Sequence, residues 1–80
     1  NTSVKLPITI SVENSNNIKI NQLEEKLSNI DLIYNFHIFK FDNKNNIYKI
    51  IFNGTPDKFI EVMKNNNYDF ETVNKIWVMK

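Results

Sequence analysis

The spacing of apolar residues switches repeatedly between the repeat of a strand and that of a helix, which limits the folds that 80 residues can form. From Val4 to Val12 every second residue is apolar, as in a strand with one buried face. Beyond it, Ser15-Asn16-Asn17 can cap a helix. The apolar residues that follow recur every three or four positions, at Ile20, Leu23, Leu27 and Ile30. This pattern predicts a strand followed by an amphipathic helix.

A β-hairpin is predicted in the middle of the chain. Residues 33–41 and 47–52 are rich in aromatic and β-branched side chains, which are typical of strands. The five residues between them, 42–46, are polar and suit a turn. A connection this short joins two strands in antiparallel orientation.

A second helix and a final strand are predicted after the hairpin. Thr55 can cap the helix, and Pro56 suits the first helical position because no amide donor is needed there. The last apolar stretches, 68–73 and 76–79, are interpreted as a final strand that can fold into a small terminal hairpin.

The resulting order of strand, helix, strand, strand, helix, strand is that of the ferredoxin-like fold. It predicts an α+β, βαββαβ sandwich with a four-stranded antiparallel sheet in the order 4-1-3-2 and two helices on one face. We expect residues 1–80 to form a single domain of this kind. Because the chain begins with Asn1 rather than Met, we also expect it to be a fragment of a larger protein.

The composition argues against several classes of function. The chain has no Cys, which excludes disulfides and thiolate metal sites, and it has no Arg. Ten Lys residues against nine Asp or Glu give a net charge of +1, without the basic excess of most nucleic-acid binders. No apolar run approaches the roughly 18 residues of a membrane span. We therefore expect no nucleic-acid partner, no membrane insertion and no cofactor.

No catalytic or metal site is predicted. His37 is the single histidine, and strand alternation places it on the outer face of the sheet as an ordinary surface residue. The segment Asp42–Asn46 faintly resembles a calcium loop but lacks the required Gly and the terminal Glu, which favours a hairpin turn. Gly54 precedes a helix start with free amides, and a plain capped helix is the simpler interpretation. We expect the chain not to be an enzyme.

The predicted hairpin is apolar on both of its faces. The side chains expected to face the helices are Phe36, Ile38, Tyr48, Ile50 and Phe52. Those expected on the opposite face are Phe39, Ile47 and Ile51. A strand pair with two apolar faces usually needs a second cover, so these three residues are candidate interface residues. A β-bulge that returns some of them to the core is the competing interpretation.

Several features together resemble one protein family. These features are the strand Leu6–Val12, the helix with Leu23 and Leu27, the Gly54-Thr55-Pro56-Asp57 segment before the second helix, and Trp77 near the end. From Leu6 to Met79 the chain resembles an uncharacterised family of proteobacterial envelope proteins, domain of unknown function 2066. The resemblance implies a small ferredoxin-like module of an exported protein, located in the periplasm or cell envelope. It implies no catalytic residue.

These observations favour a non-enzymatic interaction or scaffolding module that binds a protein. The partner would be a neighbouring domain of the parent chain, a second copy as in a homodimer, or a strand that adds to the sheet edge. A small-ligand regulatory module is the alternative, but that class usually has a Gly-rich turn where residues 13–17 stand. An RNA-binding domain is a further alternative, weakened because residues 5–11 place no aromatic side chain on the outer face.

Overall fold

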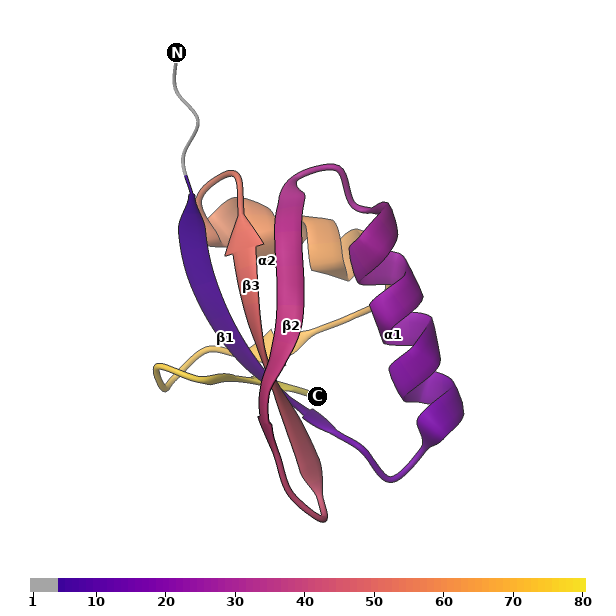
Figure 1. The fold of residues 1–80 in the computed structure, drawn as a ribbon. Helices are drawn as coiled ribbons and strands as arrows, with labels where there is room; N and C mark the ends of the chain where they lie inside the picture. The colour runs from indigo at the N-terminus through magenta and orange to yellow at the C-terminus, as the bar shows by residue number, and fades with distance from the viewer. Residues whose placement is uncertain (1–4) are drawn as a thin grey trace.

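The computed structural model describes residues 5–80 and contains two helices and one five-stranded sheet (Figure 1). The elements in chain order are β1 (Leu6–Glu13), α1 (Asn17–Asn29), β2 (Ile33–Phe41), β3 (Asn45–Phe52), α2 (Pro56–Asn65), β4 (Phe70–Glu71) and β5 (Trp77–Met79). The predicted α+β class is therefore confirmed. The first strand begins at Leu6, and Val4 lies outside the described residues.

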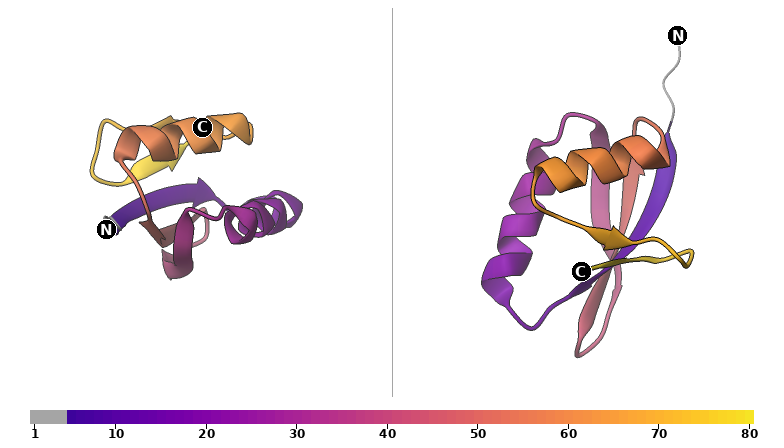
Figure 2. Two further views of the ribbon diagram at one scale, coloured as in Figure 1. Left: turned by 90° about the horizontal axis from the view of Figure 1, so that it is seen from above. Right: turned by 180° about the vertical axis from the view of Figure 1, so that it is seen from behind.

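The sheet has the order β2-β3-β1-β5-β4. The three long strands are antiparallel neighbours: β1 pairs with β3 from Leu6 opposite Phe52 to Glu13 opposite Asn45, and β2 pairs with β3 on the other side. The strand on the far side of β1 is β5, which runs parallel to it. Seen from behind, α2 crosses over the strands and α1 lies to one side (Figure 2).

The expected four-stranded antiparallel sheet in the order 4-1-3-2 is wrong at the end of the chain. A single last strand arriving from α2 would run antiparallel to β1. Here the chain first forms the two-residue strand β4 and turns back through residues 72–76. The second arm of this terminal hairpin, β5, is the one that reaches β1, with Phe70 opposite Met79 inside the hairpin. One extra reversal therefore adds a fifth strand and changes the last pairing from antiparallel to parallel.

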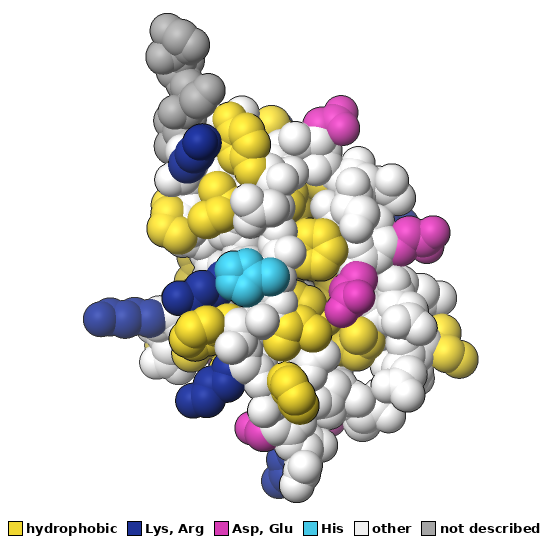
Figure 3. Space-filling view, in the orientation of Figure 1, with side chains coloured by type: hydrophobic (Ala, Val, Ile, Leu, Met, Phe, Trp, Pro, Cys, Tyr) yellow, Lys and Arg dark blue, Asp and Glu magenta, His cyan; other side chains and the backbone are white. Residues whose placement is uncertain are grey.

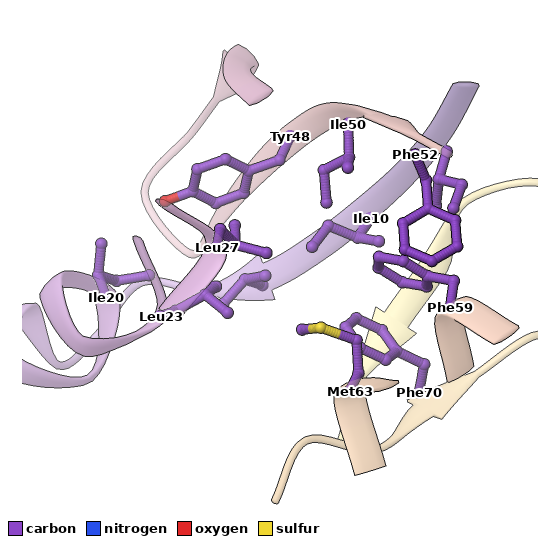
Figure 4. Close-up of a cluster of buried hydrophobic side chains, with 12 residues drawn as sticks. Ile10, Ile20, Leu23, Leu27, Tyr48, Ile50, Phe52, Phe59, Met63 and Phe70 are labelled. Carbon is purple, nitrogen blue, oxygen red and sulfur yellow. The ribbon is translucent and has the colours of Figure 1, made fainter. Parts of the chain in front are cut away.

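One face of the sheet carries the core, and both helices contribute to it (Figure 4). The buried side chains are Ile8, Ile10, Val12, Ile20, Leu23, Leu27, Tyr48, Ile50, Phe52, Phe59, Met63 and Phe70. Phe59 of α2 lies among three other rings, with centroid distances of 5.2 Å to Phe52, 5.9 Å to Phe70 and 6.0 Å to Trp77. It therefore joins the long strands to the terminal hairpin through aromatic packing.

Both helices begin at side-chain caps. The Oδ1 atom of Asn16 accepts hydrogen bonds from the amides of Ile18 and Lys19, at 2.9 and 3.2 Å. Thr55 Oγ1 accepts a hydrogen bond from the Lys58 amide at 3.2 Å, and Pro56 follows it as the sequence predicts. Each cap satisfies amide donors that have no partner within the helix, which fixes where the helix begins.

Gly54 lies in the short connection between β3 and α2, where the backbone passes close to the Phe52 ring. Its φ is +157°, and a Cβ atom added there would lie 2.8 Å from Cε2 of the buried Phe52 ring. A side chain at this position would therefore press on the core, which explains why the single glycine of the chain stands here.

A buried hydroxyl joins β3 to α1. The ring of Tyr48 is fully buried, and its hydroxyl donates a 2.7 Å hydrogen bond to Oε2 of Glu24. Burial, followed by this bond to the carboxylate, raises the pKa of Tyr48 to about 12. The hydroxyl is therefore held neutral as a structural donor between the helix and the sheet.

Candidate interaction surface

The outer face of the sheet is the face turned away from the core. Along β3 the buried residues alternate with Ile47, Lys49 and Ile51, which must therefore point outward. Ile47 and Ile51 are half-buried, because they pack beside the neighbouring strands. Ile47 lies opposite Ser11 of β1, and Ile51 lies opposite Pro7. Two of the three candidate interface residues thus lie on the outer face of β3, between β2 and β1.

Phe39, the third candidate, lies in a β-bulge of β2. The register between β2 and β3 shifts between Ile38 and Lys40, and Phe39 is the residue without an opposite partner. The Nζ atom of Lys49 lies 4.1 Å from the centroid of the Phe39 ring, so the ring is also on the outer face. It remains 55% exposed. The β-bulge of the competing interpretation is therefore present, but it does not return the Phe39 side chain to the core.

The bulge does change the direction of the residues after it. Lys40 pairs with Ile47 and points outward, while Phe41 pairs with Asn46 and points toward the helix side. Phe41 is nevertheless 73% exposed, because this end of the hairpin extends beyond the core. The helix-facing Ile38 is likewise 44% exposed, so it points to the helix side as expected but is not covered there. The last part of β2 therefore has uncovered apolar side chains on both faces.

The outer face is positively charged as well as apolar. His37 lies opposite Lys49 in the β2–β3 pair, and Lys40 follows at the bulge. Lys5 extends over the ring of Tyr34, at 5.3 Å from its centroid. The space-filling view shows the cyan histidine and dark blue lysine side chains among yellow apolar ones (Figure 3).

Opposite charge is scarce on this face. Among the described outward-facing residues of β1, β2 and β3, the one carboxylate is Glu13, at the far end of β1 opposite Asn45. Among the described residues the one ion pair is the 3.5 Å contact of Lys58 with Glu61 on α2, so no lysine of the outer face forms an ion pair. Lys40 does act electrostatically on the carboxyl of Asp42 in the adjoining turn, where it helps to lower the pKa of Asp42.

The sequence also singled out His37 and the segment 42–46 as possible sites. His37 is exposed on the outer face. Asp42 Oδ1 accepts hydrogen bonds from the amides of Lys44 and Asn45, both at 2.8 Å, and these bonds lower the pKa of the Asp42 carboxyl. Residues 42–44 thus form a tight turn around this carboxylate. Within residues 5–80 no three His, Asp or Glu side chains gather closely enough to hold a metal ion.

A separate hollow of about 580 Å³ lies between α1 and the end of the chain. Its lining includes Lys19, Lys26 and Lys80, together with Glu25 and the ring of Tyr68. Cations and a carboxylate share this hollow, so its charge does not favour one ligand class. It contains none of the candidate interface residues.

Sequence reasoning missed Tyr34, Lys40 and Lys49 as members of the outer face. The outward direction of Lys49 follows from its alternation with Tyr48 and Ile50, so the signal was present. Lys40 could not be placed in this way, because strict alternation from His37 would turn it toward the helices. The bulge at Phe39 reverses that assignment.

Across the described part of the chain, neither helix is long and apolar enough to span a membrane.

The sequence was also compared with known proteins. No family model, curated protein or solved structure matched the sequence.

Proposed function

We propose that this chain is a non-enzymatic interaction module that binds another protein through the outer face of β2 and β3. The observation that carries the proposal is the cluster formed by Phe39, Ile47 and Ile51 on a face that neither helix covers. Of the eight large apolar side chains that are most exposed among the described residues, Tyr34, Ile38, Phe39 and Phe41 belong to β2. Tyr34 and Phe39 lie on the outer face, and Ile38 and Phe41 continue the apolar surface on the helix side of the same strand. Such a concentration on one strand is typical of a binding surface rather than of scattered surface residues.

The context of the module is part of the same proposal. We infer that the domain is a variant of the ferredoxin-like arrangement, since the neighbours β2-β3-β1 keep the order of that fold. The resemblance to proteobacterial envelope proteins supports a place in the periplasm or cell envelope as a piece of a larger protein. The exposed apolar cluster would then dock a neighbouring domain, a second copy or a partner strand.

Selection from a random peptide library displayed on phage tests this function. We expect peptides selected on the wild-type domain to bind Phe39→Ser about tenfold more weakly, because a large apolar side chain at an interface centre contributes roughly 1–2 kcal/mol. Val73→Ser is the matched control, since Val73 is 82% exposed and lies in the turn between β4 and β5. Equal binding to both variants, or no enrichment on the wild-type domain, would overturn the proposed function.

A further inference from the structure

β2 ends the sheet, so one of its edges has no strand partner among the described residues. Its first part lies beside α1, and the two elements line a small hollow together through Leu27, Ser28 and residues 33–36. The second part, residues 37–41, has no lining role in that hollow and carries the exposed Ile38, Phe39 and Phe41. An exposed apolar edge of this kind is a template for strand addition.

The two faces at this edge differ in chemistry. On the outer face His37 and Lys40 flank the edge, with Lys49 on the next strand. On the helix side stand the apolar side chains of Ile38 and Phe41. Ile38 lies opposite Tyr48, whose hydroxyl donates its hydrogen bond to Glu24 of α1. An added strand sends successive side chains to opposite faces. Its acidic side chains would therefore meet the lysines while its apolar ones cover Ile38 and Phe41.

We propose that an extended segment of a partner protein, with alternating apolar and acidic residues, adds as a sixth strand along residues 37–41 of β2. This inference rests on the proposed function and names the chemistry of its partner. The main-chain groups of the free edge would supply affinity, and the alternating side chains would supply specificity.

Charge favours this partner over a second copy of the chain. Two β2 edges paired about His37 would bring the two histidines together and gather the lysines of both copies on one outer face. Like charges placed opposite each other destabilise a strand pair. An acidic segment instead adds negative charge beside Lys40 and Lys49, neither of which forms an ion pair within the described residues.

The ring geometry favours a peptide over a nucleic acid. The rings that bases would stack on, Phe39 and Tyr34, already have a lysine ammonium over one face, at 4.1 and 5.3 Å. The aliphatic Ile47 and Ile51 on the neighbouring strand β3 offer apolar contact of the kind that protein side chains use.

Synthetic peptides test the proposal by NMR titration and amide hydrogen exchange. The probe is a seven-residue peptide of alternating Val and Glu with blocked ends. Two control peptides carry the same residues in separate blocks, or Lys in place of Glu. We expect the alternating acidic peptide to bind about tenfold more tightly than either control, and to slow amide exchange within residues 37–41 by about tenfold.

Two variants that each replace one lysine with glutamate test the charge contribution, one at the proposed site and one away from it. Lys40→Glu should weaken binding of the acidic peptide by about tenfold, because it removes an attraction and adds a repulsion. Lys75→Glu, in the turn between β4 and β5, should change it less than about twofold.

The possible outcomes separate this inference from the proposed function. Strand addition is wrong if peptides bind and perturb Phe39 while exchange of the β2 amides is unchanged, and the outer face would then still be a docking surface. It is also wrong if the Lys peptide binds as tightly as the Glu peptide, or if an added nucleic acid competes more strongly than the acidic peptide. If none of the three peptides binds, the inference of strand addition is wrong. The proposed function is tested separately, by the phage selection.

Discussion

Phe59→Ala is expected to lower the free energy of unfolding by about 3–5 kcal/mol, the range for removal of a buried Phe. The ring is fully buried and contacts Phe52, Phe70 and Trp77. Its loss would leave a cavity at the point where α2, β3 and the terminal hairpin meet. An 80-residue domain has little stability to spare, so this single change removes much of it.

Urea unfolding followed by fluorescence of the single Trp measures the effect of Phe59→Ala. Phe41→Ala is the matched control, because it removes the same group from a side chain that is 73% exposed. We expect the control to change the free energy of unfolding by less than about 0.5–1 kcal/mol. Similar losses in the two variants would show that Phe59 is not at the centre of the core.

The stability of the domain should fall between about pH 10 and 12 because of Tyr48. Its pKa is raised from 10.0 to about 12 in the folded chain, so the folded state keeps a proton that the unfolded state releases. The stabilisation is present in full below pH 10 and is lost as the pH rises through 12. A shift of two pH units corresponds to at most about 2.7 kcal/mol, and partial solvation of the hydroxyl beside Glu24 reduces this to roughly 1–2 kcal/mol.

Comparison with Tyr48→Phe isolates this contribution from other groups that titrate in alkali. Near neutral pH the variant should be about 1 kcal/mol less stable, because it loses the hydrogen bond to Glu24. From pH 10 to 12 the gap should close and then reverse. Parallel stability curves for the two proteins over that range would mean that the Tyr48 hydroxyl is not held neutral in the fold.

The elements of the core could be predicted because each depends on a local pattern. The alternation around Ile8 and Ile10, the helical repeat of Leu23 and Leu27, and the Thr55-Pro56 helix start all appear in the structure. Apolar periodicity reports which face of an element is buried, and caps report where helices begin.

The sheet order could not be predicted at its last strand, because pairing there depends on a contact over a long distance in sequence. The apolar pattern from Phe70 to Met79 is compatible with one strand and with a short hairpin. Packing of Phe70 and Trp77 against Phe59 accompanies the hairpin, which puts β5 rather than β4 beside β1.

The candidate interface was predictable in its apolar part and not in its charged part. Phe39, Ile47 and Ile51 lie on the outer face as alternation indicates, and their role in binding stays a prediction. The position of Lys40 depends on a register shift that has no marker in the sequence, since no glycine stands at the bulge. The positive character of the face therefore became visible only with the strand register.

Hydroxyl-radical footprinting of the isolated domain, read by mass spectrometry, measures whether the outer face of the sheet is exposed to solvent. Light scattering on the same sample confirms that the domain is a monomer. If its own chain leaves the outer face uncovered, Phe39 should be oxidised rapidly, as should the exposed Phe41 on the helix side, while Phe52 and Phe59 stay protected. If Phe39 were as protected as Phe52 in the monomer, the outer face would be covered by this chain itself, and the account of a docking surface would be contradicted.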